Sequence, residues 1–292
     1  MTPEVAEQRT ILKILAGSHV HGLNVETSDR DEEAIVIEPL GDMVTLGQSW
    51  EDIEQIGMLQ LCSDAHVSDL HRVEDCRACH KLPDRKYFSL RKWCRMAAHG
   101  NPNFLLMLFA PPSHIIQADA RGYQLRELAP AFISKQAIRS HLGYMKGQRA
   151  RMLNQIACHE GVGRNGRHGK PRHDLCEKFG YDTKFAMHLL RLGMQGCELA
   201  STERITLPLE DPEKDWLLSV RRGEVPLQDV LDVAESLEAQ MKENFDTSAL
   251  PEHPDYATIE EWMQRMYIRT WSADRKSLDV LEDTARFEGG PH

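Results

Sequence analysis

The chain lacks any long hydrophobic run. No apolar stretch in its 292 residues reaches the length that a membrane-spanning helix needs. The first residues, MTPEVAEQR, are polar and charged, whereas a secretory signal carries an apolar core behind a basic start. These two absences argue against a membrane protein and against an exported one. We therefore expect a cytoplasmic protein without a membrane partner.

The chain is also poor in basic residues relative to acidic ones. It has 35 Lys and Arg against 45 Asp and Glu, for a formal net charge of -10 at pH 7. Generic binding of DNA or RNA needs clustered lysine and arginine, so this balance argues against it. A local basic site remains open. One candidate is the segment GVGRNGRHGKPRH at residues 161–173, expected to be a loop between helices, either a plain solvated loop or one that grips phosphates.

Cysteines are few and scattered. There are 7, an odd number, and without an export signal we expect reduced thiols and no disulfide framework. The segment CRACH, from Cys76 to His80, has the pattern of covalent haem attachment, but that chemistry belongs to exported proteins. A zinc site at Cys76 and Cys79 stays open, because the pair has the right spacing while no second pair completes four ligands.

What the chain does contain is a Gly-Ser pair followed closely by two aspartates, in GSHVHGLNVETSDRD. The preceding residues 10–16, TILKILA, are β-branched and leucine-rich and stop at a glycine, which indicates a buried strand or the end of a helix. A turn at Gly17 and Ser18 can direct backbone N–H groups at an anion, and the Ser18 hydroxyl adds a donor. The sequence therefore predicts a phosphate-binding turn.

Asp29 and Asp31 are expected to act together. With the apolar run at residues 34–37 they form one predicted extended segment, and residues two apart on a strand project from the same face. Mg2+ prefers oxygen ligands, keeps several waters and takes its other ligands from substrate phosphates. A pair of Mg2+ ions, or of Mn2+ ions, could clamp the attacking and leaving oxygens of a phosphoryl transfer. The two aspartates thus predict a metal-dependent site.

With these motifs the sequence resembles the DNA polymerase beta superfamily of nucleotidyltransferases, specifically its predicted bacterial and phage branch. That family combines a Gly-Ser turn with an Asp-x-Asp on a strand, which Gly17, Ser18, Asp29 and Asp31 match. The resemblance covers nearly all of residues 10–271. It includes the segments DRKYFSLRKWCRMAAHGNPNFLLMLF (84–109), GYMKGQR (143–149), GYDTKFAMHLLRLGMQG (180–196), RITLPL (204–209) and RRGEVPLQDVL (221–231).

The resemblance implies a third carboxylate. In this branch an acidic residue precedes the aromatic-Ser-Leu-Arg-Lys segment, and Asp84 stands at that place, with Asp75 and Glu74 as fallback positions. We expect Asp84 to begin a strand beside that of Asp29 and to share the metal ions. The alternative is that Asp84, next to Pro83, opens a turn or caps the following segment.

A basic stripe is expected farther along the chain. Lys184, His188 and Arg191 lie at i, i+4 and i+7, so one face of a helix would carry all three. Such a stripe can meet a triphosphate, or it can be a surface face paired with acidic neighbours. The resemblance, in which this pattern recurs, adds weight to the nucleotide site.

The rest of the chain has helical patterns. Apolar spacing with Gly and Pro stops predicts helices at residues 90–98, 104–109, 135–158, 182–194, 226–245 and 257–271. We therefore expect an α+β fold, in which a small mixed β-sheet nucleotidyltransferase core is followed by a helical bundle. Residues 1–120 are assigned to the catalytic domain and residues 121–292 to a helical domain that completes the nucleotide and acceptor cleft.

The functional prediction is a nucleotidyltransferase. It moves a nucleoside monophosphate from an NTP donor, such as ATP, to an acceptor hydroxyl and releases pyrophosphate. RNA or tRNA comes first among the acceptors, and DNA, a protein or a small molecule remain open. The alternative is a catalytically silent nucleotide- or nucleic-acid-binding regulatory module of the same fold. A complete trio of carboxylates favours the enzyme.

Overall fold

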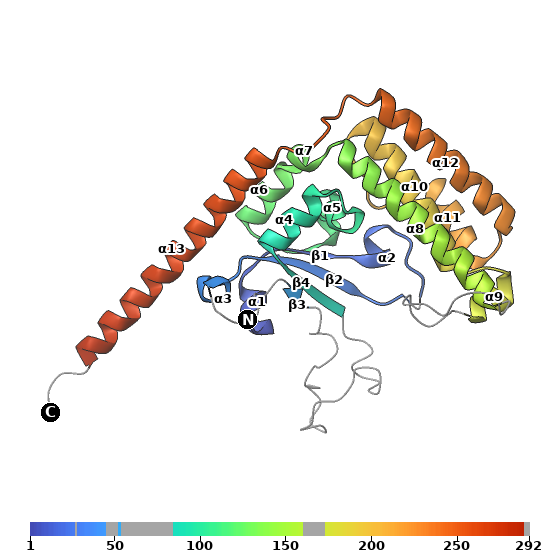
Figure 1. Cartoon of the computed structure of the whole chain (residues 1–292). Helices are drawn as coiled ribbons and strands as arrows, with labels where there is room; N and C mark the ends of the chain where they lie inside the picture. The colour runs from blue at the N-terminus through green and yellow to red at the C-terminus, as the bar shows by residue number, and fades with distance from the viewer. Residues whose placement is uncertain (27, 45–51, 54–83, 160–172, 289–292) are drawn as a thin grey trace, which may run out of the picture.

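The structure, a computed structural model, describes residues 1–26, 28–44, 52–53, 84–159 and 173–288 (Figure 1). The strands are β1 (Thr10–Leu15), β2 (Asp31–Val36), β3 (Asp52–Ile53), β4 (Asp84–Ser89) and β5 (Ile115–Ala118). The helices are α1 (Pro3–Gln8), α2 (Gly17–Val20), α3 (Leu40–Val44), α4 (Leu90–Ala98), α5 (Pro102–Phe109), the 3-10 turn η3 (Pro112–His114), α6 (Ala120–Glu127), α7 (Ala129–Phe132), α8 (Lys135–His159), α9 (His173–Phe179), α10 (Thr183–Thr202), α11 (Glu213–Arg222), α12 (Leu227–Thr247) and α13 (Tyr256–Glu288).

The sheet is mixed. Its strand order is β3-β4-β2-β1-β5, with β2 and β4 parallel and the other neighbouring pairs antiparallel. The parallel pair sets Asp31 opposite Asp84 and Glu33 opposite Lys86. Paired residues project from the same face of a sheet, so these four side chains share one face. A small mixed sheet that precedes a largely helical region confirms the predicted α+β fold.

The main core is one continuous cluster, which lies between that face of the sheet and the helices α4 and α6 and extends into α5, α8 and the helices that follow. Leu12 and Ile35 are fully buried there. Trp93 of α4 is fully buried as well, and its Nε1 donates a hydrogen bond to Sδ of Met107 at 3.1 Å. Its ring packs edge-on against the ring of Phe132, with 5.5 Å between the ring centroids. Burial of each large apolar side chain stabilises the fold by about 1.5–3 kcal/mol. The core therefore fixes the sheet on the helices.

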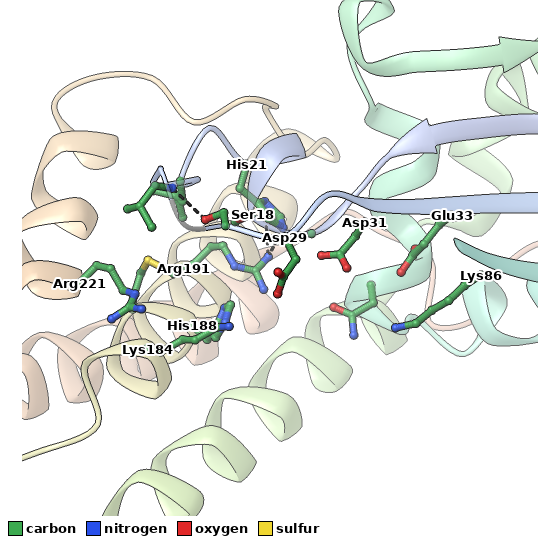
Figure 2. A pocket seen from close by; sticks show the side chains of 16 residues that line it. Ser18, His21, Asp29, Asp31, Glu33, Lys86, Lys184, His188, Arg191 and Arg221 are labelled. Atoms are coloured by element: carbon green, nitrogen blue, oxygen red, sulfur yellow. Dashed lines mark hydrogen bonds between the residues drawn. The ribbon is translucent and has the colours of Figure 1, made fainter. Parts of the chain in front are cut away.

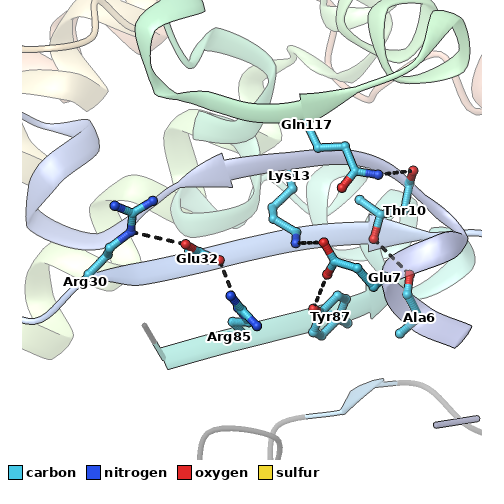
Figure 3. Close-up of polar contacts among 9 residues, drawn as sticks. All are labelled: Ala6, Glu7, Thr10, Lys13, Arg30, Glu32, Arg85, Tyr87 and Gln117. Atoms are coloured by element: carbon cyan, nitrogen blue, oxygen red, sulfur yellow. Dashed lines mark hydrogen bonds and ion pairs between the residues drawn. The ribbon is translucent and has the colours of Figure 1, made fainter. Parts of the chain in front are cut away.

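The opposite face of the sheet combines a small apolar cluster of Ala6, Ala34, Val36 and Tyr87 with polar contacts. Figure 3 shows Glu7 of α1 accepting hydrogen bonds from Lys13 of β1 and Tyr87 of β4. Toward the start of the parallel pair, the buried Glu32 of β2 accepts a hydrogen bond from Nε of Arg85 at 3.0 Å. These contacts join α1, β1, β2 and β4, and they hold the first residues of the two parallel strands side by side.

Helix α10 is central to the second part of the chain and packs against α8, α9, α11 and α12 (Figure 1). Two glycines let α12 come close. A Cβ added at Gly196 would lie 2.4 Å from Cε of Met241, and one added at Gly193 would lie 2.9 Å from Cδ1 of Leu237. Side chains on α10 are consequently held from several sides.

The predicted helices are present, with some different ends. Residues 90–98 form α4 as predicted, whereas α10 runs past the predicted end at residue 194 to Thr202. It continues because Gly193 and Gly196 pack against α12 and do not end the helix. Helix α13 also continues past the predicted end at residue 271. Over the described residues, no helix combines the length and apolar character needed to cross a bilayer.

Candidate functional site

A cavity of about 310 Å³ lies where the sheet meets α10 and α11 (Figure 2). We call its two sides the sheet wall and the helical wall. The sheet wall consists of Asp29, Asp31, Glu33 and Lys86, and helix α5 adds Asn103 to the lining. The helical wall consists of Lys184, Met187, His188, Arg191 and Arg221. Between them, α2 and the loop that follows it contribute Gly17, Ser18, His21, Leu23, Val25 and Ser28.

Asp29 and Asp31 both line the cavity, but they do not lie on one strand. The sequence predicts a single extended segment through both, whereas β2 begins at Asp31 and Asp29 belongs to the preceding loop. The reason is the partner strand: β1 ends at Leu15, opposite Glu32, and the chain then turns into α2. The alternation of β2 brings Glu33 to the face of Asp31 instead, so the sheet wall has three carboxylates.

Asp84 stands at the start of β4, directly opposite Asp31 in the parallel ladder. The strand beside β2 is therefore present as predicted. Asp84 is exposed and is not among the lining residues, while Lys86, two residues on, faces the cavity. The fallback positions Glu74 and Asp75 lie outside the described residues, as do the zinc candidates Cys76 and Cys79 and most of the basic segment 161–173.

The charges of the sheet wall act on one another. Burial raises the pKa of Asp31; Lys86 opposes this shift, and the negative charges of Asp84 and Asp29 add to it. Burial also raises the pKa of Glu33 to about 7, again against the effect of Lys86. Carboxyl groups with raised pKa values indicate negative charge that is incompletely compensated. A bound cation would relieve it.

The turn at Gly17 is built against Asp31. Gly17 has a φ of 62°, and a Cβ added there would lie 2.0 Å from Oδ2 of Asp31. Only glycine satisfies both conditions without strain. The N–H of Ala16 also donates to the carbonyl oxygen of Asp31 at 2.8 Å. The Gly-Ser turn and the first carboxylate of β2 therefore form one unit, with Ser18 facing the cavity.

The helical wall brings together the three basic residues of α10. Lys184, His188 and Arg191 all line the cavity, which agrees with their spacing along one helix face. The helix starts at a fixed place because Oδ1 of the buried Asp182 accepts hydrogen bonds from the N–H groups of Lys184 and Phe185, each at 3.0 Å. The stripe therefore begins at the cavity mouth and runs inward.

Arg191 is the least accessible residue of the stripe. It is 5% exposed, and burial lowers its pKa to about 10. Its Nη1 donates to Nε2 of His21 at 2.6 Å and to Oε1 of Gln195 at 3.0 Å. Burial, with the charges of Arg191 and His188, keeps the pKa of His21 well below its usual value, so His21 is a neutral acceptor. Arg191 thus fastens the end of α2 to α10.

Nine lining residues are not among the predicted site residues: His21, Leu23, Val25, Ser28, Glu33, Lys86, Asn103, Met187 and Arg221. Strand alternation would have found two of them, since Glu33 follows Asp31 and Lys86 follows Asp84 at a spacing of two. Arg221 has no such local signal, because α11 reaches the cavity only through its packing against α10. Among the described lining residues, the helical wall is basic and the carboxylates belong to the sheet wall.

The sheet wall suits a divalent cation. Asp29, Asp31 and the neighbouring Asp84 offer carboxylate oxygens, and the raised pKa of Asp31 reflects burial together with its neighbours' charge. Within the described ranges, no three His, Cys, Asp or Glu side chains are grouped closely enough to hold a metal ion by themselves. Mg2+ does not require such a group, because it often binds through one or two carboxylates, water and substrate phosphates.

One family of known proteins matches most of the chain. The model of the RNA repair pathway DNA polymerase beta family matches residues 3–265. That range contains every residue that lines the cavity. Neither the curated proteins nor the solved structures include a match to the chain.

Proposed function

The chain belongs to the RNA repair pathway DNA polymerase beta family, and from that premise we propose that it is a metal-dependent nucleotidyltransferase. It would transfer a nucleoside monophosphate from an NTP to an acceptor hydroxyl. The observation that carries this proposal is that the sheet wall, with its carboxylates, and the basic helical wall meet at a Gly-Ser turn (Figure 2). A triphosphate with bound cations needs both kinds of surface within one cavity.

Two carboxylates of the sheet wall and the neighbouring Asp84 would hold the metal ions. Asp29, Asp31 and Asp84 are the proposed ligands of two Mg2+ ions, with Mn2+ as a substitute. When bound, these ions neutralise phosphate charge and make the acceptor oxygen a better nucleophile. Asp84 has a second proposed role: its exposed position beside Asp31 suits a group that accepts the proton of the acceptor hydroxyl.

The turn and the basic wall would hold the donor. Backbone N–H groups at Gly17 and Ser18, with Lys184 and His188, are the proposed phosphate ligands, and Arg191 adds positive charge beneath them. The acceptor oxygen forms a bond to the α-phosphorus, the bond from that phosphorus to the bridging oxygen breaks, and pyrophosphate leaves.

The acceptor is proposed from the family. Its description names an RNA repair pathway, so we propose a hydroxyl of RNA, including tRNA. The net charge of -10 makes tight, sequence-independent capture of RNA along the whole surface unfavourable. Recognition would depend on contacts near the cavity.

The test is a transfer assay with the full chain. The protein is incubated with Mg2+ or Mn2+, each labelled NTP and separate pools of RNA, tRNA, DNA, protein and small hydroxyl compounds. We expect label on RNA, and none with the Asp29→Asn, Asp31→Asn double variant. Glu26→Gln is the matched control, since Glu26 is an exposed acid of the same loop outside the cavity lining.

Each outcome separates the alternatives. Label on DNA, protein or a small molecule would keep the transferase and replace the acceptor. NTP binding without transfer to any pool would identify a catalytically silent binding module. Equal transfer by the wild type and the double variant would contradict the proposed chemistry.

A further inference from the structure

Arg221 is the residue of the helical wall that the sequence motifs do not explain. It lies in the last turn of α11, is half-buried and lines the cavity. The next residue, Arg222, lies in the same helical turn but differs in exposure and in contacts. It is exposed, it is absent from the cavity lining, and its Nε and Nη2 bind the two carboxylate oxygens of Glu224 at 2.7 and 2.9 Å.

The guanidinium of Arg221 is oriented by a hydrogen bond to a hydroxyl group and not by a carboxylate. Its Nη1 donates to Oγ1 of Thr183 at 3.1 Å, and Thr183 is fully buried at the first position of α10. Across the described ranges, no Asp or Glu forms an ion pair with Arg221. Its guanidinium is therefore oriented at the cavity while its charge stays available to a ligand.

The other arginine of the wall is engaged differently. Arg191 is nearly inaccessible, and one of its terminal nitrogens is already bonded to His21 and Gln195. Arg221 is thus the more accessible guanidinium of this cavity. A planar guanidinium matches two oxygens of one phosphate group, which a lysine ammonium cannot do.

Arg221 lies at the end of the cavity away from Asp31 and Glu33, with Asp29 between them (Figure 2). Figure 2 places Arg221 on one side, Lys184 and His188 next to it, and Asp31, Glu33 and Lys86 on the far side. A donor whose α-phosphate reacts beside Asp31 would extend its remaining phosphates along Lys184 toward Arg221. Lys184, His188 and Arg221 would then lie along its polyphosphate chain.

We propose that Arg221 binds the terminal phosphate of the donor and thereby makes the protein select nucleoside triphosphates over monophosphates. This inference rests on the proposed function and names the residue that sets its donor class. Thr183 is the positioning residue that directs the guanidinium. The same contact would hold the pyrophosphate as it leaves.

The experiment compares two adjacent arginines by calorimetric titration of the full chain. Wild type, Arg221→Gln and Arg222→Gln are titrated with each of the four NTPs and with the matching NMPs. Arg221→Gln should weaken NTP binding at least about tenfold, the loss typical of a hydrogen bond to a charged group, and leave NMP binding unchanged. Arg222→Gln should change neither. Arg221→Lys should recover part of the NTP affinity, because it restores the charge without the planar fork.

The outcomes distinguish this inference from the proposed function. If the wild type binds no NTP, both fail. If the wild type binds NTP and transfers label while Arg221→Gln resembles Arg222→Gln, the inference alone is wrong. An equal loss of NTP and NMP affinity in Arg221→Gln would also overturn it, since a terminal-phosphate contact acts on the NTP only. Thermal unfolding of each variant shows whether a loss of affinity reflects misfolding. If Arg221→Gln does not fold, Arg221→Lys is compared with the wild type instead.

Discussion

The two walls of the cavity are built in different ways. The three acidic residues of the sheet wall come from one short loop and from β2, and Lys86 comes from the adjacent β4, so local sequence and one pairing register place them. The basic residues of the helical wall come from α10 and α11, whose positions depend on packing against α8, α9 and α12. The sheet wall is therefore specified by local sequence and one strand pairing, whereas the helical wall depends on packing within the helical bundle.

The α2 turn connects these two walls. At one end Gly17 packs on Asp31, and at the other end His21 accepts a hydrogen bond from Arg191. The carbonyl oxygen of His21 also accepts a hydrogen bond from the N–H of Leu209, in the loop between α10 and α11. A change within the turn should therefore affect both walls, while changes within one wall should be separable.

Gly17→Ala should have the largest effect, because it disturbs both walls. The substitution forces a side chain into a backbone conformation with positive φ and into the Asp31 carboxylate, which together should cost about 3 kcal/mol. Transfer and NTP binding should both be lost. Urea denaturation gives the stability change. Gly143→Ala is the control, since Gly143 lies in α8 with nothing near its Cβ position, and it should raise stability by about 0.5–1 kcal/mol. Full activity in Gly17→Ala would disprove the coupling.

Asp84→Asn tests the third proposed metal ligand, which stands beside the sheet wall and opposite Asp31 in the strand pairing. Asp84 is a proposed metal ligand and proton acceptor. Removal of its charge should therefore lower the transfer rate about a hundredfold. NTP affinity measured without metal should stay unchanged, because the helical wall is intact. The sharper comparison is Glu33→Gln on the same face of the sheet, which should have the smaller effect. If Glu33→Gln proves the more damaging, Glu33 is the third carboxylate.

His141 tests the packing behind the helical wall. This fully buried residue of α8 faces α10; burial, with the charge of Arg191, lowers its pKa to about 4, despite a hydrogen bond to the carbonyl oxygen of Ala137. The unfolded chain, with an ordinary histidine pKa of about 6.5, therefore takes up the proton first as the pH falls. Stability contributed by neutral His141 is complete above pH 6.5 and declines toward pH 4, by about 2 kcal/mol at pH 5.

The measurement is urea denaturation of wild type and His141→Leu at pH 7.5 and at pH 5. The variant should lose about 2 kcal/mol less stability on acidification than the wild type. Some pH dependence should remain, because burial also keeps the pKa of His21 low. His99→Gln, at an exposed histidine that caps α4, should behave like the wild type. An unchanged pH dependence in His141→Leu would show that the folded protein protonates this histidine as readily as the unfolded chain does.

The sequence predicts those parts of the site that have a local pattern and misses those that depend on contacts between distant segments. The turn, Asp29, Asp31 and the strand at Asp84 were predicted because each has a local pattern, and the α10 stripe because helical spacing groups its residues. The break in the strand before Asp31 was missed, since it depends on where β1 ends. The bracing role of Arg191 was missed for a related reason: spacing gives the face of a helix but not the partner, here His21, that covers it.

Lys184→Gln should give the smallest effect and isolate the helical wall. Lys184 starts the stripe at the cavity, and its loss removes one charge from the proposed path of the donor phosphates while leaving the Arg191 contact with His21 intact. We expect NTP affinity to fall about tenfold. The transfer rate at saturating NTP should fall much less, because the variant weakens donor binding while the proposed metal ligands stay in place. Lys178→Gln is the control, since it removes the same charge from an exposed position on α9. A variant in which the saturating rate falls as far as the affinity would show that the two walls do not act separately, and that Lys184 contacts the phosphate at which the bond breaks.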